Sequence, residues 1–445
     1  MTSIVFRNGM CINRGKQEIM DVLVRRGRIE RVAPQVTVQG DIEEIDCTGL
    51  WIIPGLIDDQ VHFREPGLTH KATIATESRA AVAGGVTTFM EMPNTKPPAL
   101  TQELLQDKYD IAASVSPANY SFYMGVSNDN YDEVMRTDPL RICGIKIFMG
   151  SSTGNMLVDD MHTLEKVFAD APCLIATHCE DEATIKHNLA VFKEKYGEDI
   201  PFAAHPLIRS REACYASSHL AVELAQKHGT RLHILHISSK EELELFDRNT
   251  PLGNKRITSE ACVHHLYYAD TDYAELGALI KCNPAIKTAD DRKALRAGLL
   301  DGSLDVMATD HAPHTWDEKQ NKYLSAPSGL PLVQHSLSLA LTLVRDGDLT
   351  PERMVDLMAH APAECFGIAD RGYLDEGSWA DLVLVDPEDS YPVTKESIAY
   401  KCGWSPLEGK TLPGVVKQTW VNGHCVYRDG VLLGQPAGMR LSFNR

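Results

Sequence analysis

The 445-residue sequence lacks the features of a membrane or secreted protein. No apolar run approaches the roughly 20 residues that a membrane-spanning helix needs. The N-terminal residues MTSIVFRNGM contain no apolar block of the kind found in signal peptides. The 11 cysteines are scattered and form no CxxC pair, which favours reduced, buried thiols. We therefore expect a cytoplasmic protein without a membrane partner.

Basic residues are also in short supply. The chain has 44 Lys and Arg against 61 Asp and Glu, a formal charge of -17. Nucleic acids and anionic membranes would repel such a protein, so neither is expected as a partner. A small anionic substrate is still compatible with this charge if a few cations are placed locally. With 43% hydrophobic and 24% charged residues, the composition is that of a soluble globular protein.

The chain shows no internal repeat and no low-complexity linker, but its texture changes twice. Residues 3–53 alternate short β-type runs with turns. From Ile52, apolar strands alternate with helical patterns over about 310 residues, and after Gly367 the β texture returns. We therefore predict an α/β fold. Residues 54–367 would form a TIM-type (β/α)8 barrel, and residues 1–53 and 368–445 together a small β-sandwich domain.

The stretch from Asp58 to Gly67 follows an apolar strand and has the pattern of a metal-binding strand end. Alternate side chains of an extended strand face the same way, so Asp58, Gln60, His62 and Arg64 would share a face. Two imidazoles at positions i and i+2 would grip one metal ion. Gln60 occupies the first of these places, and an amide oxygen is a weaker ligand than imidazole for zinc-like ions.

Four further polar residues lie at or near the ends of other apolar strands, namely Lys146, His178, His236 and Asp310. The carboxyl ends of barrel strands converge on one face, so these residues and His62 would meet at a single site. One such histidine alone is more commonly a surface or core residue, but their joint occurrence in order favours a zinc-like metal site. A lysine ammonium cannot bind a cation, whereas its carbamate would bridge two metal ions.

The longer motifs resemble those of the dihydroorotases of the cyclic amidohydrolase superfamily, over nearly the whole chain. The matching segments are Pro54-Gly55-Leu56-Ile57-Asp58, His62-Phe63-Arg64-Glu65-Pro66-Gly67, Gly84-Gly85-Val86-Thr87-Thr88, Met92-Pro93-Asn94-Thr95, Gly144-Ile145-Lys146-Ile147-Phe148, Thr177-His178-Cys179-Glu180-Asp181, Leu235-His236-Ile237-Ser238, Ala308-Thr309-Asp310-His311-Ala312-Pro313-His314, Ala326-Pro327-Ser328-Gly329, Ala380-Asp381-Leu382-Val383-Leu384-Val385-Asp386 and Ser405-Pro406-Leu407-Glu408-Gly409.

This resemblance implies a site for one or two zinc ions. His62, Asp310 and the carbamate of Lys146 would hold one ion, and His178, His236 and the same carbamate the other. The implied reaction is the reversible hydrolysis of dihydroorotate to N-carbamoyl-aspartate in pyrimidine biosynthesis. Asp310 would take a proton from the nucleophile and pass it to the departing amide nitrogen. A homodimer is the assembly that the resemblance implies.

The resemblance also implies a set of substrate-binding residues. A guanidinium fork matches a carboxylate best, so Arg64 would be the centre of a clamp for the substrate carboxylate. The alternative for Arg64 is a salt bridge to Glu65 or another acid. The complete implied set is Arg64, Asn94 and His314 for the carboxylate, Asn283 for the ring, and Ala326 and Gly329 through their backbone.

Three departures from the family pattern leave alternatives open: Gln60 at the first metal histidine, Ala285-Ile286-Lys287 in place of Pro-Leu-Arg, and Gln334 where an acid is common. An active enzyme with a weakened first metal position is one interpretation. A non-catalytic partner protein is another, although it would have little reason to keep the other ligands. A hydantoinase or allantoinase is a third, against which Arg64 and Asn94 count.

Overall fold

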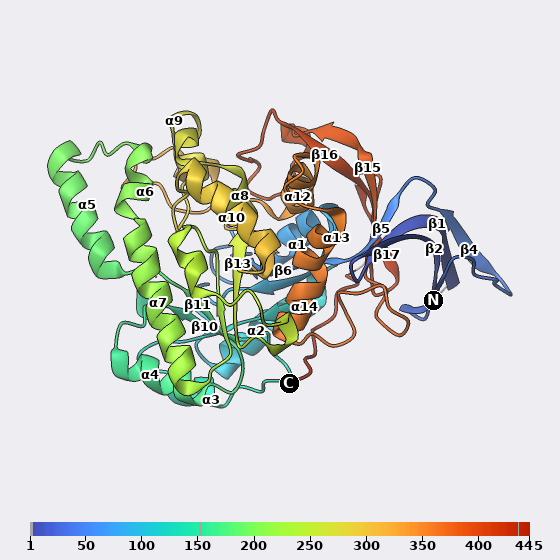
Figure 1. Ribbon diagram of the computed structural model, residues 1–445, viewed down its shortest axis with the longest axis horizontal. Coiled ribbons are helices and arrows are strands. Elements are labelled where there is room, and N and C mark those ends of the chain that lie inside the picture. Colours follow the sequence, from blue (N-terminus) through green and yellow to red (C-terminus); the bar gives the residue numbers. More distant parts are fainter. Residues whose placement is uncertain (1–2, 151–153, 435) are drawn as a thin grey trace.

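The computed structural model describes residues 3–150, 154–434 and 436–445. Two groups of strands organise the chain: a ring of parallel strands surrounded by helices, and a large, mainly antiparallel sheet at its side (Figure 1). Among the described residues, no helix is long and apolar enough to cross a membrane.

The ring is the predicted (β/α)8 barrel, which is thereby confirmed. Its strands are β6 (Leu56–Val61), β7 (Val86–Glu91), β8 (Asn119–Phe122), β9 (Met124–Gly125), β10 (Ile145–Phe148), β11 (Ile175–His178), β12 (Leu232–Ile234), β13 (Ile257–Cys262) and β14 (Val306–Ala308). Only Tyr123 separates β8 from β9, so the two share one of eight places in the described ring. The ring closes where the backbone N–H of His62 donates to the carbonyl of His311 at 2.7 Å.

Helices cover the outside of the ring (Figure 1). The longer ones are α1 (Ile74–Ala83), α2 (Gln102–Val115), α4 (Met161–Asp170), α5 (Glu182–Tyr196), α7 (Arg211–His228), α10 (Ala289–Asp301) and α12 (Ser336–Arg345). The shorter ones are α3 (Tyr131–Met135), α6 (His205–Ile208), α8 (Val263–Tyr267), α9 (Tyr273–Leu276), α11 (Trp316–Lys319), α13 (Pro351–Val355) and α14 (Ala361–Phe366). Sequence-encoded caps fix several ends: Ser210 accepts from a backbone N–H of α7, and Gly229 ends that helix in a left-handed conformation.

The second sheet draws strands from both ends of the chain, as predicted. Its strands are β1 (Ser3–Asn13), β2 (Lys16–Arg25), β3 (Arg28–Ala33), β4 (Ile42–Asp46), β5 (Trp51–Pro54), β15 (Leu382–Pro392), β16 (Thr411–Val421), β17 (His424–Arg428) and β18 (Val431–Leu432). The order is β18-β17-β16-β15-β5-β1-β2-β3, with β4 also paired to β1. Phe6 of β1 meets Trp420 of β16 at 5.2 Å between ring centroids, which is the inward packing of a small β-sandwich domain. The division at residues 53/54 and 367/368 stays a prediction.

A buried polar clasp fixes the small domain to the barrel. Asp381, just before β15, pairs with Arg371 and accepts hydrogen bonds from Asn119 of β8 and from the backbone of Asn422. Thr419 of β16 also donates to the carbonyl of Val82 at the end of α1. The contacts fall on the side of β6 to β8, so this sector of the barrel is held from outside.

Candidate functional site

One cavity of about 100 Å³ collects most of the predicted site residues. The ends of β6, β10 and β11 and the connections after β7, β12, β13 and β14 supply its walls. The lining residues are Gln60, His62, Arg64, Asn94, Lys146, Phe148, His178, His236, Asn283, Asp310, Ala312, Ser328 and Gly329. Two predicted residues, His314 and Ala326, are not among the lining residues.

His62 and Asp310 form the first donor pair. His62 Nε2 lies 3.0 Å from Asp310 Oδ1, and its Nδ1 lies 2.8 Å from Asn94 Oδ1. An amide oxygen only accepts hydrogen bonds, so Nδ1 carries the ring hydrogen and Nε2 turns its lone pair to the carboxylate. Burial lowers the pKa of His62, which favours this neutral ring. Two acceptors that face each other at this distance are the arrangement that a cation satisfies.

His178 and His236 form the second pair. Their Nδ1 and Nε2 atoms lie 3.0 Å apart, and His178 Nε2 lies 2.9 Å from Glu180 Oε2. That carboxylate fixes the hydrogen on Nε2, so Nδ1 of His178 presents a lone pair to the other ring. Arg209 donates to the same carboxylate oxygen at 2.5 Å. Burial alone would raise the pKa of Glu180, but Arg209 and His178 hold this pKa below its usual range.

Lys146 lines the same cavity as the two pairs. Its side chain is 1% exposed, and its Nζ lies 4.5 Å from the centroid of the Phe148 ring. Burial lowers the pKa of Lys146 to about 7. A substantial fraction of the amine is therefore neutral near pH 7, and the neutral amine is the form that adds CO2.

Three site residues have backbones in the left-handed region: Arg64 at φ 69°, His236 at φ 41° and Asp310 at φ 48°. Residues other than glycine rarely adopt this conformation, and it persists where the surroundings impose it. At His236 the backbone N–H donates to Glu260 Oε1 at 3.1 Å. Beside Asp310, the Thr309 hydroxyl donates to Asp58 at 2.6 Å. These bonds hold the turns that carry His236 and Asp310 in place.

Arg64 reaches the cavity by a different route from the one predicted. Strand β6 ends at Val61, so strand alternation does not extend to position 64. Instead, its left-handed backbone directs the side chain inward, where Nε donates to the Pro313 carbonyl at 3.0 Å and Nη2 lies 3.1 Å from His314 Nε2. Burial lowers the pKa of Arg64 to about 10, so the guanidinium stays charged at neutral pH. No salt bridge to Glu65 is found among the described residues.

His314 supports Arg64 rather than lining the cavity. Burial and the charge of Arg64 lower the pKa of His314 to about 3, so the ring is neutral. Its Nδ1 lies 2.9 Å from Lys71 Nζ and its Nε2 lies 2.9 Å from the Ser328 carbonyl, and Lys71 pairs with Glu318 at 2.9 Å. A second cation, Lys71, therefore lies across the His314 ring from the Arg64 guanidinium.

The loop of Ala326 to Gly329 closes the cavity opposite the strand ends. Gly329 has φ 135°, and a Cβ there would lie 2.5 Å from the Ala312 carbonyl, so only glycine fits. Two buried lysines hold the loop: Lys281 donates to the Ala326 carbonyl at 2.6 Å, and Lys319 to the Gly329 carbonyl at 2.8 Å. Nearby, the Oδ1 atom of Asn283 is buried without a hydrogen-bond partner among the described residues.

Two of the three departures from the family pattern have structural explanations. Lys287 is buried and donates to Ser238 Oγ at 2.8 Å, in the loop that follows His236. Gln334 donates from Nε2 to the Ser397 carbonyl and accepts the Ala399 N–H at Oε1, each at 2.8 Å. A carboxylate could not make the first of these bonds.

Sequence reasoning missed several residues that shape the site. Glu180 stands two positions after His178, and this spacing was its available signal. Two buried groups of ligand-type side chains also went unpredicted: Asp59 with His233 and Glu260, and Cys262 with His264 and His265. In the first group, Asp59 and Glu260 raise the pKa of His233 to about 9 despite its burial, so that group is an internal ion pair.

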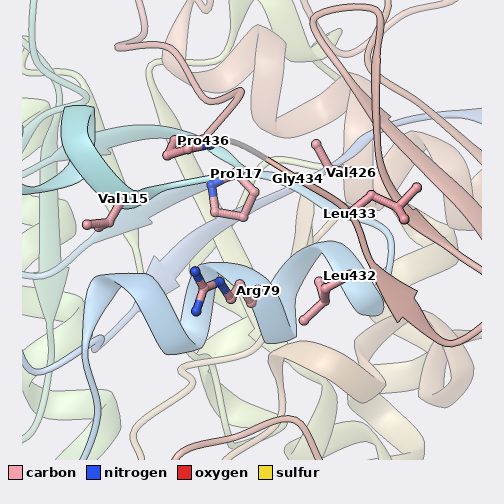
Figure 2. A pocket seen from close by; sticks show the side chains of 8 residues that line it. All are labelled: Arg79, Val115, Pro117, Val426, Leu432, Leu433, Gly434 and Pro436. Carbon is pink, nitrogen blue, oxygen red and sulfur yellow. The ribbon is translucent and has the colours of Figure 1, made fainter.

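A second hollow, of about 240 Å³, lies on the outer face beside α1 (Figure 2). Arg79 and apolar residues such as Pro117 and Leu432 line it, and it contains none of the predicted site residues. The donor pairs and Lys146 belong to the barrel cavity alone.

Comparison with known proteins places these features in a family. The sequence profile of the amidohydrolase family matches residues 51–426. A dihydroorotase of Listeria innocua is 34% identical over 435 residues, with 96% of this chain and 99% of that protein covered. A dihydroorotase of Halobacterium salinarum is 36% identical over 365 residues, with 80% and 82% covered. The structure of an L-hydantoinase (dihydropyrimidinase) from Arthrobacter aurescens aligns with a TM-score of 0.94 at 25% identity, over 99% of this chain and 100% of that one.

Proposed function

The chain belongs to the amidohydrolase family and is a hydrolase of cyclic amides, and we propose that it is a dihydroorotase. It would interconvert dihydroorotate and N-carbamoyl-aspartate, a step of pyrimidine biosynthesis. The observation that carries this proposal is the charged guanidinium of Arg64 in the same cavity as the two donor pairs. Dihydroorotate has a carboxylate for that guanidinium to bind, whereas hydantoin and allantoin lack one in that place.

The residues present fit a metal centre. Zinc ligands of nitrogen and oxygen lie about 2.0–2.2 Å from the ion, so neighbouring ligands of a tetrahedral ion are roughly 3.3–3.6 Å apart. Both donor pairs, at 3.0 Å, lie only about 0.3 Å below this range. We assign His62 and Asp310 to one zinc ion and His178 and His236 to a second, with Lys146 as N6-carboxylated bridge. Such ions polarise a carbonyl and lower the pKa of bound water.

Gln60 does not complete the first position in its present orientation. Its Nε2 donates to Asp310 Oδ1 at 3.2 Å, so its amide hydrogens face the place where a histidine would offer a lone pair. This supports an enzyme whose first metal position depends on His62, Asp310 and the Lys146 carbamate.

We propose that Asp310 moves the proton of the reaction. We assign its carboxylate the proton of the attacking water; the water oxygen forms the new bond to the ring carbonyl carbon. The same proton then passes from the Asp310 carboxyl group to the ring amide nitrogen as the carbon–nitrogen bond breaks. The hydrogen bond from Gln60 and the left-handed backbone of Asp310 hold the carboxylate in one orientation.

The remaining lining residues suit the rest of dihydroorotate. We assign Arg64 to the substrate carboxylate, with His314 and Lys71 as its support. The amide oxygen of Asn94 accepts the hydrogen bond from His62 Nδ1, which leaves the amide hydrogens of Asn94 for the same carboxylate. We assign the unpartnered Asn283 Oδ1 to a ring N–H. To the opposite edge of the ring we assign the carbonyls of Ala326 and Gly329, which already accept from Lys281 and Lys319 and each have a second lone pair.

We further propose a homodimer in a reducing cytoplasm. All 11 cysteines are free and nine of them are buried, as expected where thiols stay reduced. The dimer rests on resemblance to the superfamily.

Hydantoinase activity is the second candidate, favoured by the TM-score of 0.94 to an L-hydantoinase. The test gives purified protein dihydroorotate, hydantoin and allantoin while metal content is measured on the same sample. We expect turnover of dihydroorotate above the other two. Turnover of hydantoin alone would identify a hydantoinase. No turnover of any substrate at full metal loading would favour the non-catalytic partner protein.

A further inference from the structure

The nitrogen and the oxygen of the Gln60 side-chain amide face different neighbours. Its hydrogens face Asp310, while its oxygen accepts a hydrogen bond from the Cys262 thiol at 3.7 Å. Amide oxygen is the only atom of Gln60 that can bind a metal ion. The ligand atom of Gln60 therefore faces away from the His62–Asp310 pair and towards Cys262.

Cys262 belongs to a compact group with His264 and His265. Cys262 ends β13, and α8 begins at the next residue, so the strand-to-helix turn brings the three side chains together. Their ligand atoms all lie within 4.8 Å of one another. The side chains are 0%, 0% and 3% exposed, and the two imidazole rings lie 4.1 Å apart between centroids.

Three of the four ring nitrogens of His264 and His265 lack a hydrogen-bond partner among the described residues. Neither ring nitrogen of His264 has a hydrogen-bond partner among the described residues, although the Thr309 backbone lies near the ring. His265 Nε2 donates to the Pro284 carbonyl at 3.0 Å. That bond places the ring hydrogen on Nε2, so Nδ1 has a lone pair, and this atom is also unpartnered. A backbone carbonyl behind a ligating imidazole is the usual outer support of a metal site.

We propose that Cys262, His264, His265 and the Gln60 amide oxygen form an additional site for a zinc-like divalent cation, behind the wall of the catalytic cavity. One sulfur, two nitrogens and one oxygen are a ligand set that zinc accepts. Zinc–sulfur and zinc–oxygen distances of about 2.3 and 2.1 Å put the two ligand atoms about 3.6 Å apart in a tetrahedron. The distance of 3.7 Å from Cys262 Sγ to Gln60 Oε1 agrees with this spacing.

Binding at this site is a ligand exchange without electron transfer. The bond from sulfur to hydrogen breaks, the proton leaves to solvent, and the thiolate binds the cation. The thiol also lies 3.8 Å from Glu260 Oε1, and that contact would be replaced as well. The proposal concerns metal binding only, so it holds or fails independently of dihydroorotase activity.

Cobalt substitution tests the site. Co²⁺ bound by a thiolate gives a charge-transfer band in the near ultraviolet, and the ligands assigned to the catalytic centre contain no sulfur. Protein loaded with Co²⁺ should show the band and bind one more metal ion per chain than Cys262→Ser, which should lack the band. Cys143→Ser is the matched control, because Cys143 is equally buried and lies outside the group. Its band should be unchanged.

The inference is overturned if cobalt-loaded wild type shows no band, or if Cys262→Ser keeps it. Circular dichroism checks that the variants fold. Should Cys262→Ser fail to fold, His264→Gln decides, since it keeps the thiol and removes one imidazole. We expect its affinity for Co²⁺ at the band-forming site to fall at least about tenfold, as for other losses of metal support. Unchanged affinity in a chelator competition would refute the site.

Discussion

Replacing Arg64 by lysine tests the carboxylate clamp most directly. The wild-type guanidinium is fixed by two contacts, to the Pro313 carbonyl and to His314, and so presents its remaining N–H groups to the cavity in a set geometry. Lysine keeps the charge but offers a single nitrogen. It cannot retain both supports and also grip a carboxylate with two parallel bonds.

The expected loss follows from the bonds removed. A hydrogen bond to a charged group contributes about 1.5–3 kcal/mol. With about 1.4 kcal/mol per tenfold change in affinity, Arg64→Lys should weaken binding of a carboxylate ligand by about 10- to 150-fold. The unsupported Pro313 carbonyl should lower stability by about 1 kcal/mol, too little to unfold the protein.

Competitive inhibition by orotate and uracil separates the clamp from general damage, because these two ligands differ by one carboxylate. In Arg64→Lys, the inhibition constant of orotate should rise by about 10- to 150-fold and that of uracil by less than about threefold. Arg79→Lys, in α1 and outside the barrel cavity, should change neither (Figure 2). Equal weakening of both ligands would refute the clamp, as would unchanged binding of orotate.

Three further substitutions test other parts of the site. Glu180→Gln should weaken metal binding about 10- to 100-fold, because it removes the carboxylate that orients His178, and chelator competition measures this; unchanged affinity would contradict that role. Burial lowers the pKa of Lys319 to about 7, against about 10.4 for a free lysine. The native state therefore loses stability as pH falls from about 10.4 to 7. The urea midpoint of wild type minus that of Lys319→Met should accordingly increase as pH is raised from about 7 to 10.4, and a difference that does not change with pH would refute this. Gln334→Glu should lose about 1–3 kcal/mol of stability with unchanged turnover, since the Ser397 carbonyl loses its donor, and impaired turnover by a stable variant would contradict it.

The sequence was sufficient for the barrel and for the convergence of the strand ends. Short apolar runs indicated the strands that end at His178 and before Asp310, and parallel topology then required their ends to meet. It was insufficient for Arg64, because a left-handed backbone after the end of β6 places that side chain, and no local pattern encodes it. Long-range contacts also decided the position of His314, which buttresses Arg64 instead of lining the cavity.

The buried thiol of Cys262 shows a second kind of limit. Its apolar surroundings predicted a reduced, buried cysteine, and it is free and 0% exposed. Its neighbours His264 and His265 directly follow the strand end, so the pattern was visible in the sequence. What the sequence could not supply was the tautomer of His265, which depends on the Pro284 carbonyl nineteen positions away.

The position of β5 in the second sheet has a consequence for biosynthesis. β5 lies between β1 and β15, and β15 begins at Leu382 whereas β5 ends at Pro54. At about 5–20 residues per second, the roughly 330 residues between them take about 15–70 s to translate. Throughout that time the nascent chain carries β5 with one unpaired edge, which is the kind of surface that templates aggregation. The small domain therefore completes its sheet only after the ribosome has finished the barrel, and a chain truncated before β15 would emerge with that edge permanently open.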